Sequence, residues 1–344
     1  MLGAVVTALL SGAEADLRQP APHKTDWFKD AGWGVFTHYL SDIALRGQEP
    51  SVEAWNRVVD AFDVEGLAKQ LASVGTKYYF VTLGQNSGYY CSANATYDRL
   101  VGNDPGKCSK RDLIADLYQA LEPRGIKLMV YLPAGAPDRD PKAMEALGWK
   151  PGKYPIWSHP KGGPDGGDPR LEDFQRKWEA VIREWSERWG NKVCGWWFDG
   201  CYYPVAMYQH PEPPNFKSFA EAARAGNPAS LVAFNPGVFD PIFSLTEHED
   251  YTAGEINEAD KVQCPGRWVK TAQFHMLSFL GPNWAQRPPR YSDAQVIEIT
   301  QRIIEEGGVA TWDVPIEPSG LIPDAFVTQL QALHTGIQSW RANQ

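Results

Sequence analysis

Residues 193–200 read VCGWWFDG, a run of six apolar or small residues followed by a carboxylate and a glycine. A short apolar run that ends at a turn is typical of a strand buried on both faces of a parallel sheet. Asp199 then stands at the carboxyl end of that strand, where barrel and open α/β enzymes carry their catalytic groups. The alternative is that Asp199 only caps the next turn. The nearby Trp197 and Tyr202 favour a functional role, because such rings suit the face of a sugar.

Strand and helix patterns alternate on both sides of this stretch. The expected strands are short apolar runs that cover residues 33–38, 77–82, 126–132, 193–199, 231–235, 250–255 and 309–314. The expected helices have apolar residues at helical spacing and cover residues 63–74, 109–124, 171–189, 292–306 and 325–340. Residues 271–280 fit either type. Roughly eight strand–helix units predict an α/β fold, a TIM-like (β/α)8 barrel that forms a single catalytic domain over residues 26–344.

The composition disfavours several kinds of partner. The net charge of −9 and the pI near 5.3 argue against nucleic acids and anionic membrane surfaces. The sequence has no apolar run of the length that a membrane span requires, about 18 residues, so no span is expected. The fourteen tryptophans exceed ordinary usage and suit either core packing or stacking on carbohydrate.

Residues 1–25 are expected to lie outside the barrel. An apolar run at 2–10 precedes AEA at 13–15, which resembles the end of a secretory signal, although the usual basic start is missing. We therefore predict a secreted or periplasmic protein. Five cysteines fit that environment, and their spacing favours a disulfide between Cys91 and Cys108. Residues 94–96 (NAT) form a glycosylation sequon.

Two carboxylates on one face of the expected barrel could hydrolyse a glycoside. Asp199 ends one expected strand, and Glu255 ends the next but one. Paired carboxylates are the catalytic groups of most glycosidases. Glu247, Glu249 and Glu258 lie close by in the sequence, so spacing alone leaves the second carboxylate open.

Five motifs along residues 26–341 resemble those of the family 29 α-L-fucosidases and occur in the same order. They lie at residues 27–38 (WF…GVFTH), 111–127 (RDL…GIK), 197–200 (WFDG), 250–255 (DYTAGE) and 307–323 (GG…IP). The resemblance implies a retaining exo-glycosidase that releases a terminal α-L-fucosyl or related sugar through a covalent glycosyl-enzyme. Its partner would be an oligosaccharide or glycoconjugate.

The resemblance also implies a role for each matching residue. Asp199 would be the nucleophile and Glu255 the acid/base, with a less polar environment raising the pKa of Glu255. His38 would reach a ring hydroxyl, or would be an ordinary core histidine. The expected substrate-binding residues are His38, Gln85, Asn86, Tyr131, Trp197, Tyr202 and Trp268.

The sequence departs from the family pattern at several positions. Family members usually carry KHHDGF after the second strand, where residues 84–89 read GQNSGY, so Gln85 and Asn86 replace two histidines that bind the sugar. The family's Trp-Gly in the first motif is replaced by Tyr39 and Leu40. A C-terminal β-sandwich, common in the family, is not expected after the last helix. These differences leave open a sugar related to fucose, or a weak or inactive carbohydrate-binding barrel.

Metal and cofactor chemistry is not expected. The seven histidines show no spacing typical of metal ligands. Residues 247–250 (EHED) could hold calcium, but a solvated acidic turn is the favoured interpretation.

Overall fold

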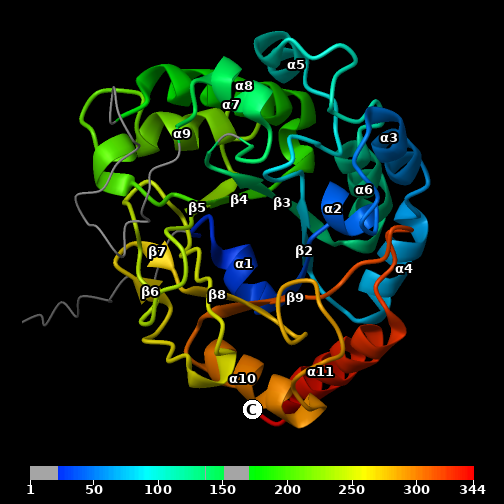
Figure 1. Cartoon of the computed structure of the whole chain (residues 1–344). Helices are drawn as coiled ribbons and strands as arrows, with labels where there is room; N and C mark the ends of the chain where they lie inside the picture. Colours follow the sequence, from blue (N-terminus) through cyan, green and yellow to red (C-terminus); the bar gives the residue numbers. More distant parts are fainter. Residues whose placement is uncertain (1–21, 136, 151–169) are drawn as a thin grey trace, which may run out of the picture.

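A curved parallel sheet of seven strands occupies the middle of the molecule, and helices surround it (Figure 1). The computed structural model describes residues 22–135, 137–150 and 170–344. The strands are β1 (Trp33–Thr37), β2 (Tyr78–Thr82), β3 (Lys127–Pro133), β4 (Gly195–Asp199), β5 (Leu231–Phe234), β8 (His275–Phe279) and β9 (Val309–Asp313). Two short strands, β6 (Trp268–Val269) and β7 (Ala272–Gln273), form a separate antiparallel pair.

The helices lie mostly outside the sheet, except that α1 lies within its curve in the view of Figure 1. They are α1 (Asp26–Ala31), α2 (Ser41–Ala44), α3 (Val52–Asp60), α4 (Val64–Ser73), α5 (Ala95–Val101), α6 (Leu113–Leu121), α7 (Pro141–Leu147), α8 (Glu172–Trp189), α9 (Phe216–Ala223), α10 (Asp293–Glu305) and α11 (Asp324–Ala342). Shorter helical turns lie at Glu122–Arg124, Gly190–Lys192, Pro204–Tyr208 and Ala259–Lys261. Among the described helices, none combines the length and apolar character that a membrane span requires.

The strand order is β5-β4-β3-β2-β1-β9-β8, and all six pairings are parallel. Each new strand from β1 to β5 is therefore laid beside the preceding one, and β9 returns to the free side of β1. Because every strand points the same way, all the carboxyl ends lie at one edge of the sheet. This edge is where parallel α/β enzymes place their active sites.

Residues 250–256 connect the two outer strands of the sheet. The Asp250 N–H donates to Val232 O on β5 at 2.8 Å, and the Ile256 N–H donates to Leu277 O on β8 at 3.0 Å. The predicted strand at 250–255 is nevertheless wrong as a regular strand. Gly254 has φ +67°, and a Cβ there would lie 1.9 Å from His275 O, so the chain bends and forms only isolated bridges.

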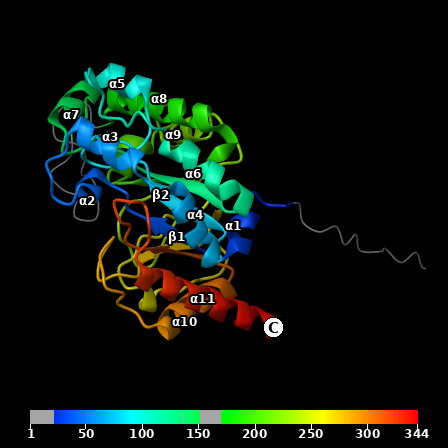
Figure 2. The same ribbon diagram turned by 90° about the vertical axis from the view of Figure 1, so that its right-hand side faces the viewer.

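Two layers of apolar side chains hold this architecture. One fills the space between the sheet and the helices and includes Trp178, Trp185 and Trp189 of α8, which confirms that this aromatic stripe is core. The other lies inside the curve of the sheet. Helix α1 covers its amino-terminal end, where the Phe28 ring centre lies 4.9 Å from that of Tyr78. Figure 2 shows α1 and α2 at opposite ends of the sheet.

Most helix limits agree with the sequence pattern, and one differs for a local reason. The predicted capping box of Ser292 and Gln295 is present at the start of α10. Helix α6 begins after Asp112 rather than at Ser109, because the Asp112 side chain accepts the Ala115 N–H and acts as the N-cap. The ambiguous residues 271–280 contain β7 and β8.

The predicted disulfide between Cys91 and Cys108 is wrong. Both residues are buried free thiols. Tyr90 and Cys108 pair in a parallel bridge, so Cys91, the next residue along, points to the other side of the chain. The sequon residue Asn94 is fully buried and donates to Val181 O at 2.9 Å, which leaves no room for a glycan in the folded protein. The predicted export signal lies outside the described residues, so export stays a prediction.

Candidate active site

Polar side chains from five strands meet at the carboxyl edge of the sheet. His38 follows β1, Gln85 follows β2, Tyr131 lies on β3, Asp199 ends β4 and Asn235 follows β5. A cavity of about 270 Å³ opens at this edge. It is lined by Phe36, His38, Leu40, Asp42, Ile43, Gln85, Tyr131, Trp197, Asp199, Glu255, Leu277, Trp284 and Ala285.

One amide group bridges the two predicted carboxylates. Asn235 Nδ2 donates to Asp199 Oδ1 at 2.9 Å and to Glu255 Oε2 at 2.6 Å. These two carboxylate oxygens therefore lie at most about 5.5 Å apart, because both hydrogen bonds start from the same nitrogen and their lengths add to that value. The Asn235 Oδ1 in turn accepts the Gly237 N–H at 3.2 Å, which fixes the orientation of the amide.

The other oxygen of Asp199 is held by a short chain of hydrogen bonds. Tyr131 Oη donates to Asp199 Oδ2 at 2.6 Å, and Gln85 Nε2 donates to Tyr131 Oη at 2.6 Å. The Tyr131 ring stacks on Trp197, with ring centres 5.4 Å apart and an angle of 20°. Both Asp199 oxygens thus have a donor, and the carboxylate has one defined orientation.

The electrostatics of the site favour the protonated form of Glu255. Burial, together with the negative charge of Asp199, raises the pKa of Glu255 to about 7, although the Asn235 N–H partly opposes the shift. The Asp199 charge is also the largest cause that raises the pKa of the Tyr202 hydroxyl. Glu255 can therefore carry a proton near neutral pH, as an acid catalyst must.

A third carboxylate positions His38. His38 Nδ1 hydrogen-bonds Asp313 Oδ1 at 2.8 Å, and the second oxygen of Asp313 accepts the Ala285 N–H at 2.7 Å. The same loop carries Trp284, whose ring centre lies 5.7 Å from that of His38. Asp313 thus orients the imidazole that faces the cavity and also holds one wall of it.

Some predicted binding residues lie outside the cavity lining. Trp268 is on β6, 39% exposed, and packs against the guanidinium of Arg267. Asn86 is half-buried beside the site, and its backbone oxygen accepts the Arg139 N–H at 2.9 Å. Tyr202 is close enough to sense both carboxylates, but it is not among the described residues that line the cavity.

The alternatives to Glu255, which are Glu247, Glu249 and Glu258, are not among the described residues that line the cavity. Among the described residues that line the cavity, Glu255 is the only glutamate. Glu249 is 4% exposed and accepts the Leu245 N–H at 2.7 Å. Asp250 pairs with Lys24 at 2.6 Å and with Arg224 at 2.7 Å. The prediction of a solvated acidic turn is therefore wrong for these two residues, because each is buried against its own partners.

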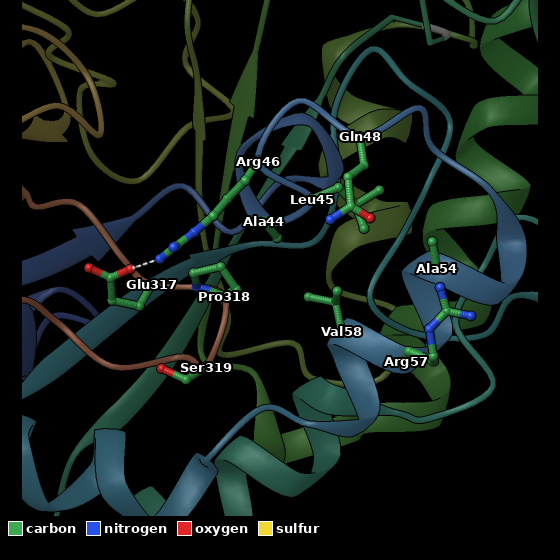
Figure 3. Close-up of a pocket in the computed structure, with 10 residues that line it drawn as sticks. All are labelled: Ala44, Leu45, Arg46, Gln48, Ala54, Arg57, Val58, Glu317, Pro318 and Ser319. Atoms are coloured by element: carbon green, nitrogen blue, oxygen red, sulfur yellow. Dashed lines mark hydrogen bonds and ion pairs between the residues drawn. The ribbon is translucent and has the colours of Figure 1, made fainter.

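Two observations concern other candidate sites. A larger recess of about 580 Å³ lies between α2, α3 and residues 317–319 (Figure 3). Among the described residues that line it, the one carboxylate is Glu317, which is paired with Arg46 in the recess and with Arg287 at 2.5 Å, so these residues do not supply a carboxylate pair. Over the described part of the chain, no cluster of three or more His, Cys, Asp or Glu residues could hold a metal ion.

Sequence reasoning missed Asn235, Asp313 and Trp284. The first two could have been found from the sequence. Each is a polar residue that directly ends an apolar run, LVAFN for Asn235 and VATWD for Asp313, as Asp199 ends GWWFD. Trp284 lies in a loop between β8 and α10 that has no such pattern.

Solved structures that resemble this chain show the fold. The endo-fucoidan hydrolase MfFcnA4 of glycoside hydrolase family 107 is 16% identical with a TM-score of 0.66, covering 93% of this chain and 55% of its own. This chain thus spans about half the length of that protein. The α-L-fucosidase AlfC from Lactobacillus casei is 17% identical with a TM-score of 0.63, covering 92% and 99%. A family 29 α-L-fucosidase from Bacteroides thetaiotaomicron is 16% identical with a TM-score of 0.62, covering 93% and 74%.

The sequence itself identifies the family. No curated protein matches the chain significantly. The family profile described as alpha-L-fucosidase matches residues 49–338, which is most of the chain. The protein therefore belongs to the alpha-L-fucosidase family and is a glycoside hydrolase.

Proposed function

We propose that the protein is a retaining exo-glycosidase that removes a terminal α-L-fucosyl or closely related residue, with Asp199 as nucleophile and Glu255 as acid/base. The observation that carries this proposal is the bridge through Asn235, which keeps one oxygen of each carboxylate within about 5.5 Å of the other. Retaining glycosidases have carboxyl groups roughly 5–5.5 Å apart, whereas inverting enzymes need about 6.5–9.5 Å to admit a water molecule.

The two steps follow from this arrangement. Protonated Glu255 gives its proton to the glycosidic oxygen while Asp199 attacks the anomeric carbon, so the C–O bond to the leaving group breaks and an ester to Asp199 forms. Glu255, now ionised, removes a proton from water, and the water oxygen displaces Asp199 from the same carbon. Two inversions give net retention, and both carboxyl groups return to their first protonation states.

The size of the cavity supports action at a chain end. About 270 Å³ is below the range of roughly 300–1,000 Å³ that is usual for ligand pockets, and it suits a single sugar ring. Trp284 lines the cavity and offers an aromatic ring for the apolar side of that sugar, whereas the Trp197 ring is stacked on Tyr131. We also infer that residues 250–256 complete the curved sheet as the sixth position of a closed (β/α)8 barrel.

Gln85 bears on which sugar fits. Its Nε2 is used to hold Tyr131, so it supports the nucleophile through that tyrosine. A primary amide offers a different donor and acceptor pattern from the histidine that the family usually has. We propose that the hydroxyl preference differs accordingly from that of other family members.

Activity on a panel of aryl glycosides tests the function. We expect the highest kcat/KM on an α-L-fucoside or an α-L-galactoside, and very little on a β-D-galactoside. A preference for the β-D-galactoside would refute the proposal. So would an Asp199→Asn variant that hydrolyses every substrate as fast as the wild type does. The likeness to endo-fucoidan hydrolases favours endo action on a fucose polymer as a second candidate, which would release oligosaccharides rather than the monosaccharide.

The pH dependence should report Glu255. Since the reaction needs the protonated acid and its pKa is raised to about 7, kcat/KM should fall as pH rises through about 7. Above that point the fall should approach tenfold per pH unit, because the protonated fraction decreases in that proportion. The measurement is kcat/KM from pH 4 to 10 for an α-L-glycoside with a poor leaving group, whose departure needs the proton of Glu255. A profile that stays flat up to pH 9 would contradict the role of Glu255.

Asn235→Ala should change the pH profile as well as the rate. The Asn235 N–H lowers the pKa of Glu255, so its removal should move the alkaline fall in kcat/KM to higher pH. Loss of the bridge should also lower kcat/KM by roughly 10- to 100-fold, since the carboxylates are then less well positioned. Asn227→Ala is the matched control, because it removes another buried amide donor, to Val193 O at 3.1 Å, outside the cavity. Equal pH profiles for the two variants would show that Asn235 is merely structural.

A further inference from the structure

A second, shallow depression adjoins the active-site cavity. Its lining includes Phe239, Ile242 and Phe243 together with Glu255. Among the described residues, Glu255 is the only one that lines both this depression and the cavity with Asp199. The depression encloses only about 10 Å³, so a ligand would lie against it rather than inside it.

The position of Glu255 indicates which part of the substrate lies in the cavity and which part lies against the depression. An acid catalyst must touch the glycosidic oxygen, which joins the departing group to the sugar that is attacked. The cavity with Asp199 must hold the attacked sugar, because the nucleophile reaches its anomeric carbon there. The group on the other side of the glycosidic oxygen must then lie beside Glu255, away from Asp199.

Aromatic side chains are presented at that place. The Phe239 and Phe243 rings meet edge to face, with ring centres 5.2 Å apart and an angle of 82°. Phe243 is 38% exposed, one of the few large apolar side chains of the described residues to be so exposed. A phenyl ring supported at its side by a second ring offers a firm apolar surface.

The loop that carries these rings is fixed at both ends. At its start, the Gly237 N–H donates to Asn235 Oδ1 at 3.2 Å, and the same amide bridges the two carboxylates. At its end, the Leu245 N–H donates to the buried Glu249 at 2.7 Å. These contacts tie the start of the loop to the amide that binds Glu255, and its end to the buried Glu249.

We propose that Phe239 and Phe243 form the leaving-group subsite and stack against the apolar face of a pyranose or aryl leaving group. This assignment rests on the proposed function, since it takes Glu255 as the acid. The subsite selects leaving groups with a flat apolar face, and disfavours small or strongly charged ones that gain nothing from the rings.

The test compares two substrates that share a sugar and differ in the leaving group. One is 4-methylumbelliferyl α-L-fucoside, whose aryl group can reach Phe243. The other is α-L-fucosyl fluoride, whose leaving group is a single atom and cannot. Phe243→Ala should lower kcat/KM on the aryl fucoside by about tenfold, the upper end of what one stacked ring contributes, and should leave the fluoride within about twofold of wild type. Phe243→Leu should give a smaller loss on the aryl substrate.

Val238→Ala is the matched control. Val238 lies in the same loop and is 42% exposed, but it is not among the described residues that line the depression. It should leave both substrates unchanged. Equal losses on the aryl fucoside and the fluoride in Phe243→Ala, or no loss on either, would overturn the subsite. A wild type that hydrolyses neither these fucosides nor the corresponding α-L-galactosides would instead refute the proposed function, and the subsite with it.

Discussion

Asp199→Asn is expected to lower kcat by on the order of 10⁴ or more, because the amide cannot form the covalent bond to the anomeric carbon. The substitution keeps the shape of the side chain between Tyr131 and Asn235. The melting temperature should therefore change by only a few degrees. The measurement is kcat for an activated α-L-fucoside with variant protein made free of wild type.

A stable Asp199→Asn protein with wild-type turnover would show that another group attacks the sugar. Asp313→Asn is an informative companion, since it changes a carboxylate at the end of another strand, β9, at the same edge of the sheet. Asp313 forms hydrogen bonds with His38 and with the Ala285 N–H. It is not among the described residues that line the cavity. The Asp313→Asn substitution should weaken substrate binding, seen as a higher KM, more than it lowers kcat.

Glu255→Ala should cost most with substrates whose leaving groups are poor. Such groups need protonation as the C–O bond breaks, so kcat/KM should fall by about 10²–10⁴ on them and much less on an activated aryl glycoside or a fluoride. With activated substrates the second step becomes slow, because no base removes the proton from water. Azide needs no base, so it should accelerate turnover and yield a glycosyl azide with the configuration of the substrate.

The control for this variant is Glu247→Ala. Glu247 lies in the same region of the sequence, and its side chain is 84% exposed, outside the cavity. It should keep wild-type rates with and without azide. Leaving-group dependence and azide rescue in Glu247→Ala, together with normal turnover in Glu255→Ala, would show that the acid has been assigned to the wrong residue.

The sequence was sufficient for the main features of the fold, for a physical reason. Parallel strands are buried on both faces, so runs such as WWF and YYFVT are continuous apolar stretches that stand out from amphipathic helices. The place of Asp199 at the carboxyl edge of the sheet was predictable because the residue directly ends such a run. The same reasoning extends to Asn235, which directly follows β5, and to Asp313, which ends β9.

Other features depend on three-dimensional relations that spacing does not contain. Residues 250–255 have a strand pattern, but the close approach of His275 O at Gly254 breaks it. Cys91 and Cys108 are well spaced for a disulfide, yet they point to opposite sides of paired chains. Trp268 has the right chemistry for a sugar site, but its short hairpin places it away from the cavity. Trp284 enters the site from a loop, which no periodic pattern could reveal.

The stereochemistry of hydrolysis tests the central claim most directly. Proton NMR would follow the anomeric signals during the first minutes of hydrolysis of an activated α-L-fucoside, before the free sugar mutarotates. If Asp199 and Glu255 act as a retaining pair held together by Asn235, the α anomer of the sugar must appear first and the β anomer only later. Initial release of the β anomer would show a single inverting displacement by water, and would contradict the account.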